Sequence, residues 1–176
     1  MHLSEKDQFR NDIKDTFHQN AWKTIANAAL NNTTLIDWLF EFMLEGKDTL
    51  ARTSSEIIRH ISDKDPNIVQ PYIDELIEAL EKPYHAGIKR CIFRMFQKAE
   101  FNNDQSGKLL DISFRYLQNR SNPIAPRVFA MTTIYNISKK FPELLPELDA
   151  TISDNLSQES AGFQNRAKKI LNRTWK

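Results

Sequence analysis

The most regular pattern of apolar and polar positions in the chain lies in residues 86–99. Apolar side chains recur there at the i, i+3, i+4, i+7 spacing of one helix face: Ile88, Cys91, Ile92, Met95, Phe96 and Ala99. The other positions carry four cations and no acid: Lys89, Arg90, Arg94 and Lys98. This pattern predicts an amphipathic α-helix with one buried face and one basic face.

The same period recurs along the whole chain and is interrupted by short polar or proline-containing turns. It predicts about ten helices, over residues 4–19, 21–30, 35–44, 47–62, 67–81, 86–99, 105–119, 124–140, 143–156 and 163–175. Ser4 and Thr34 are expected to cap helix starts, and Gly46 is expected to end a helix. No segment alternates apolar and polar residues over a strand length, so the predicted fold class is all-α.

Every second predicted helix has a basic residue near its start, and these residues are regularly spaced. Arg52, Arg90, Arg127 and Arg166 follow one another at intervals of 38, 37 and 39 residues. Two of the first helices begin at prolines 76 residues apart, Pro66 and Pro142. The chain is therefore expected to repeat a unit of helix, turn and helix, and such units bury their apolar faces by stacking on their neighbours.

This repeat resembles the HEAT repeats of the armadillo-type superfamily, and the segment Pro123-Ile124-Ala125-Pro126-Arg127-Val128 is similar to the typical start of their second helix. The resemblance covers residues 33–176, and residues 1–32 fit a shorter opening pair. It implies a right-handed α-solenoid of about five stacked helical hairpins. The expected organisation is a single domain, 1–176, with helix pairs at about 4–31, 33–62, 66–99, 104–140 and 142–175.

Composition narrows the possible functions. The chain has 176 residues, of which 40% are hydrophobic and 27% charged, so it can bury a core. Only four glycines are present, whereas the common nucleotide-binding loops need glycine clusters, and a lone cysteine excludes a disulfide framework. The N-terminus is polar, and no apolar run approaches the roughly 18 residues of a membrane span. We expect a cytoplasmic protein without a membrane partner or a small-molecule cofactor.

Candidate catalytic and metal-binding groups are few. No pair among His2, His18, His60 and His85 has the spacing of a helical zinc site, so no metal is expected. His85 and Cys91 could form a nucleophile pair only if Cys91 were an accessible thiolate. Because Cys91 occupies a core position, it is interpreted as a buried structural cysteine. The sequence therefore predicts no catalytic residues and no enzyme activity.

Charge differs between the first and second helices of the predicted units. The first helices are acidic, whereas residues 86–99, 124–140 and 161–176 contain many Lys and Arg residues and no Asp or Glu. The resemblance implies that second helices line the concave side of the solenoid, which would then be basic. The candidate partner-binding residues are Arg90, Arg94, Arg127, Arg166, Lys169 and Arg173. The alternative is that cations simply favour helix C-termini and solvated faces.

Aromatic residues offer a second kind of candidate contact. Phe93 lies among the basic positions of residues 86–99, and Trp175 lies beside Arg173 and Lys176 near the end of the chain. Both are candidate partner contacts, because aromatic side chains anchor peptides and stack on bases. The alternative for Phe93 is packing against the neighbouring repeat. The alternative for Trp175, as for Trp22 and Trp38, is a place in the core or a cap on the end of the array.

Three functions remain open from the sequence. The first is a non-catalytic scaffold whose concave surface binds a protein partner, which is expected to be acidic. The second, the alternative to the first, is a nucleic-acid-binding protein related to the HEAT-like alkylpurine DNA glycosylases, which act in DNA repair. These enzymes use tryptophans together with an aspartate, and the second-helix segments named above contain no aspartate. The third is a regulator that oligomerises through residues 35–44, which requires Trp38, Leu39 and Phe42 to be exposed in the monomer.

Overall fold

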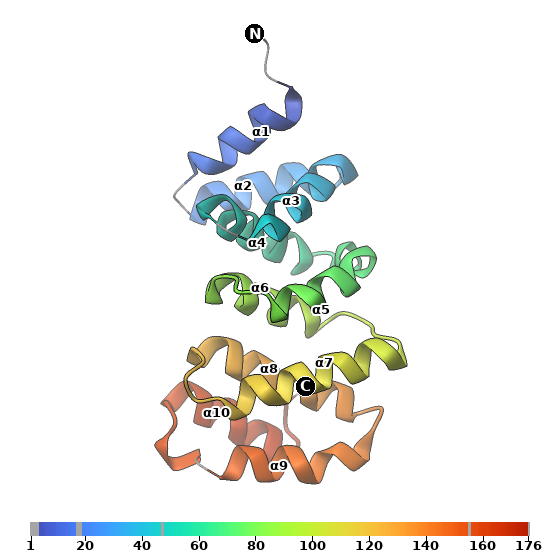
Figure 1. Cartoon of the computed structure of the whole chain (residues 1–176), viewed down its shortest axis with the longest axis vertical. Helices are drawn as coiled ribbons and strands as arrows, with labels where there is room; N and C mark the ends of the chain where they lie inside the picture. Colours follow the sequence, from blue (N-terminus) through green and yellow to red (C-terminus); the bar gives the residue numbers. More distant parts are fainter. Residues whose placement is uncertain (1–3, 17–18, 47, 155, 176) are drawn as a thin grey trace. The chain divides into compact units, whose positions relative to one another are not determined.

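The computed structural model describes residues 4–16, 19–46, 48–154 and 156–175. Within these residues the chain forms ten α-helices and three short 3-10 helices, without a strand (Figure 1). The contacts divide the chain into two compact units, Met1–Glu100 and Phe101–Lys176, here called the N-terminal unit and the C-terminal unit. The all-α fold predicted from the periodicity is confirmed.

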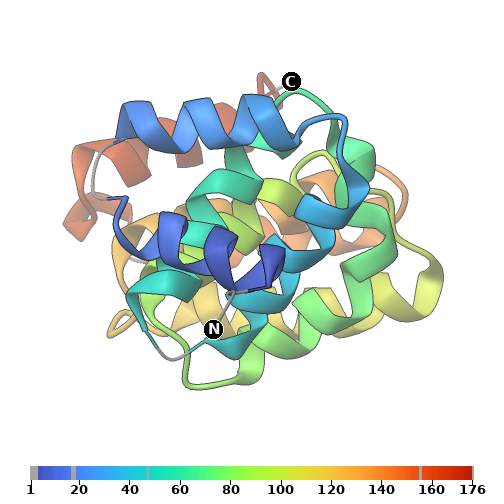
Figure 2. The same ribbon diagram turned by 90° about the horizontal axis from the view of Figure 1, so that it is seen from above.

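The N-terminal unit contains six α-helices and one 3-10 helix: α1 (Glu5–Lys14), α2 (Gln19–Ala29), α3 (Thr33–Glu45), α4 (Thr49–Ser62), η1 (Pro66–Tyr72), α5 (Ile73–Glu81) and α6 (Ala86–Phe96). Its hairpins follow one another in chain order (Figure 1), and Figure 2 views them along the stacking direction. The second helices α2, α4 and α6 pack side by side. The centre of the unit is a layer of fully buried side chains, among them Phe40, Ile57, Ile58 and Ile92.

The C-terminal unit contains α7 (Asn103–Gln118), α8 (Ile124–Ser138), η2 (Pro142–Leu144), α9 (Leu145–Ser153), η3 (Leu156–Gln158) and α10 (Ala161–Leu171). Helices α7 and α8 form one hairpin, and α9 and α10 both pack against α8. Its core consists of Leu117, Met131, Ile134, Tyr135, Leu148, Ile152, Phe163, Ala167 and Ile170. The division between the units coincides with the expected boundary between two helix pairs; the single domain itself stays a prediction.

Two of the predicted helix-end signals match the structure, and others do not. The Ser4 hydroxyl accepts the Asp7 amide, and Gly46 ends α3 in the left-handed region at φ 70°, both as predicted. The predicted cap at Thr34 is wrong, because Asn32 caps α3 by accepting the Leu35 amide at 3.2 Å. The first helix ends at Lys14 instead of residue 19, and residues 17 and 18 lie outside the described part of the chain. So does residue 47, where another helix was expected to begin.

Prolines shorten two helices that the periodicity predicts to be continuous. Residues 67–81 were expected to form one helix, but η1 precedes α5 and contains Pro71. Proline has no amide hydrogen, and its ring clashes with the carbonyl four residues earlier, so it fits only the start of an α-helix. Likewise η2 precedes α9, whose first turn contains Pro146. The last helix, expected over 163–175, ends at Leu171.

The apolar segment at residues 35–44 belongs to the core of the N-terminal unit. Leu39 and Phe42 are fully buried, and Trp38 is half-buried with its ring 6.1 Å from that of Phe9. The sequence-based suggestion that this segment mediates oligomerisation required these side chains to be exposed. The segment instead forms part of the packing of one chain.

Candidate partner-binding surfaces

The predicted partner-binding cations lie on or directly after the second helices α6, α8 and α10. We define two surfaces. The N-terminal second-helix face consists of Arg52, Glu56, Arg59 and Asp63 on or directly after α4, and Arg90 and Arg94 on α6. The C-terminal second-helix face consists of Lys139 directly after α8, Arg166 and Lys169 on α10, and Trp175 just after it. The fully buried Thr132 of α8 contacts Arg166 from the interior. The two surfaces differ in whether the arginines of the later helix are paired with acids of the chain.

On the N-terminal second-helix face, cations and carboxylates alternate. The guanidinium of Arg90 pairs with Glu56, and Nη2 of Arg94 lies 3.1 Å from Oδ2 of Asp63. Arg59 joins both acids, since its Nε and Nη1 each lie 2.9 Å from a carboxylate oxygen, of Glu56 and Asp63 respectively. Arg90 and Arg94 therefore already have partners inside the chain, and the acids of α4 compensate much of the charge of α6.

Two predicted contact residues are buried, and for them the prediction is wrong. Phe93 is fully buried in α6 and cannot touch a partner. Arg127 is only 4% exposed. Its Nη2 and Nη1 lie 2.6 and 3.1 Å from the two carboxylate oxygens of Glu159, and its Nε donates to the carbonyl of Leu117 at 3.2 Å. Arg127 thus holds a buried structural ion pair, because the start of α8 faces the turn that precedes α10.

Arg166 has a different environment from the other second-helix arginines. Its Nη1 donates to the Thr132 hydroxyl at 2.6 Å, and its Cζ lies 3.6 Å from the centre of the Trp175 ring. Burial lowers the pKa of Arg166 from its ordinary value, and no carboxylate contributes to the shift. Within the described residues, its neighbours are thus a neutral hydroxyl and aromatic rings, including Phe129 at 5.9 Å.

The turn after α10 places Trp175 on Arg166. The amides of Thr174 and Trp175 donate to the carbonyl of Lys169 at 2.8 and 3.1 Å, and Arg173 adopts a left-handed φ of 58°. The guanidinium of Arg173 forms two bonds to Asp149, at 2.9 and 2.6 Å. Arg173 is therefore ion-paired within the chain. Lys169, one turn beyond Arg166, is exposed, and no hydrogen bond or ion pair joins its ammonium group to a described residue.

The repeat explains why the two faces differ. Arg90 and Arg166 are 76 residues apart, which is two repeat units, and the acids that compensate the N-terminal face can be followed over the same interval. Glu56 corresponds to Thr132, and Asp63 corresponds to Lys139. A neutral residue and a cation thus stand where the N-terminal unit has acids. The absence of acids at these two positions can be found in the sequence alone. Finding it requires that the acids of the repeat units be aligned as well as the arginines.

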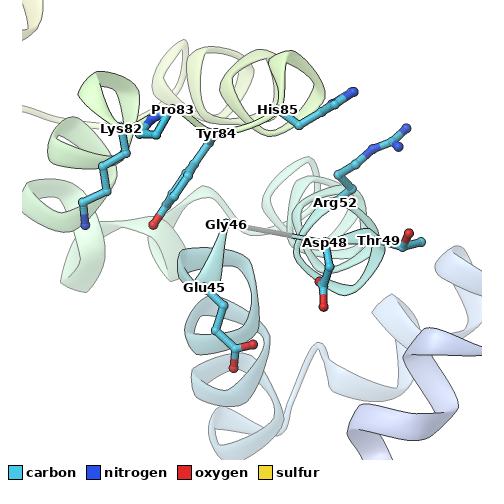
Figure 3. Close-up of a pocket in the computed structure, with 9 residues that line it drawn as sticks. All are labelled: Glu45, Gly46, Asp48, Thr49, Arg52, Lys82, Pro83, Tyr84 and His85. Carbon is cyan, nitrogen blue, oxygen red and sulfur yellow. The ribbon is translucent and has the colours of Figure 1, made fainter.

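A cleft of the N-terminal unit with a volume of about 760 Å³ lies between the end of α3, the start of α4 and residues 82–85 (Figure 3). The Tyr84 ring crosses to Gly46, and its hydroxyl donates to the carbonyl of Leu44. Arg52 and His85 extend to one side of the cleft, as Figure 3 shows. Glu45 is already paired with Arg10. In the described part of the chain, no cluster of His, Cys, Asp and Glu residues could hold a metal ion.

The suggested nucleophile pair is not supported by the surroundings of its thiol. Cys91 is fully buried, as predicted, and this burial raises its pKa to about 12. A thiol with that pKa is protonated at neutral pH and is a poor nucleophile. His85 lies exposed at the start of α6, where its Nδ1 accepts the Gly87 amide at 3.0 Å. Its hydrogen bond caps the helix.

None of the described helices combines the length and apolar character needed to cross a membrane. No curated protein and no solved structure matches this chain. The sequence profile of the HEAT repeat domain does match it, over residues 9–174. That span includes all the second helices and the arginines at intervals of about 38 residues that define the repeat. By this match and by its succession of helical hairpins, the chain belongs to the HEAT repeat domain family.

Proposed function

We propose that this protein is a non-catalytic binding module, and that its C-terminal second-helix face binds an acidic segment of a protein partner. HEAT repeats commonly mediate interactions between proteins. Beyond this general role, we propose that the partner segment is acidic and that it binds the C-terminal second-helix face. Both points rest on the distribution of charge in the C-terminal unit.

The observation that carries the proposal is the absence of acids from both second helices of this unit. Helices α8 and α10 contain no Asp or Glu. Arg127 is compensated by Glu159, but Arg166 is not paired with a described carboxylate, and Lys168 and Lys169 are exposed on the same helix. Lys139 and Lys140 follow α8 and are exposed. An acidic segment supplies the complementary charge, which favours both rapid association and correct orientation.

Nucleic acid is the second candidate, because its phosphates also complement a basic surface. The aromatic ring of Trp175 beside Arg166 suits stacking on a base as well as packing against a peptide. We rank it lower because Arg90, Arg94, Arg127 and Arg173 are each paired with an acid of the chain itself, which leaves fewer second-helix cations for phosphates. No observation favours the glycosylase chemistry considered from the sequence.

The test compares three fluorescent probes: a Glu-rich peptide of about 15 residues, the same peptide with Gln in place of Glu, and a DNA duplex. Binding to the full chain is measured by fluorescence anisotropy at low and moderate salt. We expect saturable binding of the Glu-rich peptide that weakens with salt, and no saturable binding of the Gln peptide. Equal binding of both peptides, or binding of the duplex alone, would overturn the proposal.

A further inference from the structure

We propose that Arg166, Thr132 and Trp175 form an anchoring site for one carboxylate side chain of the partner. The site is here called the Arg166 anchor. This inference rests on the proposed function, since it names the residue type that the C-terminal second-helix face recognises. It follows from the geometry of the guanidinium, from the comparison with the chain's other second-helix arginines, and from the way Trp175 is held.

The guanidinium of Arg166 is fixed in place but incompletely bonded. Thr132 accepts from its Nη1 at 2.6 Å while its own hydroxyl donates to the carbonyl of Val128 at 3.0 Å, so the hydroxyl is committed in both directions. Trp175 covers the guanidinium at 3.6 Å. A guanidinium has five N–H donors in one plane, and the described residues supply an acceptor for one donor of Arg166. A carboxylate is the side chain that accepts from two such donors at once.

Two other second-helix arginines, at positions equivalent to Arg166 in the repeat, are paired with carboxylates of the chain. Arg90, two repeats earlier, pairs with Glu56 of the preceding second helix, and Arg127 pairs with both oxygens of Glu159. Thr132 takes the place of Glu56 in the C-terminal unit, and its side chain is shorter and neutral. No described residue supplies the carboxylate that would complete the pair, and we infer that it comes from a partner. A partner carboxylate at Arg166 would reproduce the Arg90–Glu56 pair between two chains.

Trp175 contributes a wall that shields the ion pair from water. Its backbone amide donates to the carbonyl of Lys169, and Arg173, two residues earlier in the same turn, is fixed by two bonds to Asp149. Side chains fixed before binding lose little conformational entropy when the partner arrives. Partial burial also strengthens a charge pair relative to one at an exposed rim. Lys169 lies at i+3 on the same helix face, so a second acid close to the first would meet a second cation.

The first experiment measures binding of the Glu-rich peptide to the full chain and to Arg166→Lys, which keeps the charge but removes the planar fork. We expect roughly tenfold weaker binding, the equivalent of about 1.4 kcal/mol. The matched control is Arg115→Lys on α7, whose guanidinium is exposed and already paired with Asp111. It should bind within about twofold of the unaltered chain. Equal affinities of Arg166→Lys and the unaltered chain would overturn the anchor while leaving the proposed function in place.

The second experiment supplies the missing acid within the chain. Thr132→Glu recreates the residue that pairs with Arg90 two repeats earlier, and it should occupy Arg166 and reduce peptide affinity by at least tenfold although every cation remains. Folding is verified by far-UV circular dichroism, and the indole resonance of Trp175, assigned with Trp175→Phe, reports the site directly. A folded Thr132→Glu variant that binds the peptide as before would contradict the anchor. Failure of the unaltered chain to bind would instead refute the proposed function.

In the unaltered chain, the same Trp175 resonance should shift on peptide addition and saturate with the anisotropy curve. This readout separates the anchor from a general electrostatic effect, because a peptide attracted only by net charge would leave one particular indole unchanged. A saturating peptide that shifts the Trp22 or Trp38 indole but not that of Trp175 would place the binding site elsewhere.

Discussion

Arginines at equivalent positions of the repeat serve different purposes, and their nearest neighbours determine which. Arg127 is buried with a carboxylate on both of its terminal nitrogens. Arg166 is half-buried beside a hydroxyl and an indole ring. The first arrangement is complete within the chain and stabilises the fold, whereas the second leaves donors without an acceptor among the described residues. Residue type and spacing alone therefore do not identify a binding residue in this protein.

The Arg127–Glu159 pair yields a prediction about stability. Arg127→Ala should lower the free energy of unfolding by about 3 kcal/mol, because it leaves the buried carboxylate of Glu159 with only the longer pair to Arg120, whose Nε lies 3.7 Å away. The double variant Arg127→Met with Glu159→Gln should cost less, since neither charge then remains in the interior. Urea unfolding followed by circular dichroism measures both.

The control for that pair is Arg115→Ala, which removes an exposed i, i+4 pair with Asp111. It should cost less than about 1 kcal/mol, as surface pairs usually do. If Arg127→Ala were as mild as Arg115→Ala, the Arg127–Glu159 pair would not be the structural element described here, and Arg127 would again be a candidate binding residue.

At the scale of elements, the ends of helices depend on single residues that the apolar period does not register. Pro71 converts the start of a predicted helix into the 3-10 helix η1, and Asn32 rather than Thr34 caps α3. Gly46 ends α3 at a positive φ, and a Cβ added there would lie 1.9 Å from Cε1 of Tyr84. The close approach of the Tyr84 ring is a tertiary contact, which local sequence signals cannot reveal.

Gly46 therefore provides a prediction for the α3–α4 connection. Gly46→Ala should destabilise the fold by more than the roughly 1–2 kcal/mol that a left-handed conformation costs a residue with a Cβ, because the added methyl also displaces the Tyr84 ring. Gly107 lies inside α7, and a Cβ added there would meet no atom within 4 Å. Gly107→Ala should accordingly stabilise the helix by up to about 1 kcal/mol.

Thermal and urea unfolding of the two glycine variants test this contrast. In the background of Tyr84→Ala, the additional cost of Gly46→Ala should fall to that of the backbone conformation alone. An equal cost with and without the tyrosine ring would show that the ring does not pack on Gly46 as described.

At the scale of the whole molecule, the sequence predicts the architecture better than the binding surface. The all-α class, the order of helices and the HEAT repeat follow from the 3.6-residue period and from arginines about 38 residues apart. These features recur many times, so local exceptions do not hide them. The surface depends instead on a few side chains: Phe93 turned out to be buried, and Arg90 and Arg94 proved to be paired with acids of the preceding second helix. The apolar and polar positions of one helix do not show which side chains of the adjacent helix will cover or pair with its residues.

The central claim is that Arg166 and Lys169 of the C-terminal second-helix face are available to a partner, whereas Arg90 and Arg94 of the N-terminal second-helix face are paired with Glu56 and Asp63. It is tested most directly by comparing two double variants. One combines Arg166→Gln and Lys169→Gln, and the other combines Arg90→Gln and Arg94→Gln. Each variant loses two positive charges, and Arg59 still pairs with Glu56 and Asp63 in the second.

The measurement is the affinity of the Glu-rich peptide for each variant at a single low salt concentration, after circular dichroism has shown that both are folded. Our account predicts that the Arg166/Lys169 variant binds at least tenfold more weakly than the unaltered chain. It predicts that the Arg90/Arg94 variant binds within about threefold. An equal loss in both variants, or a loss confined to the Arg90/Arg94 variant, would contradict it.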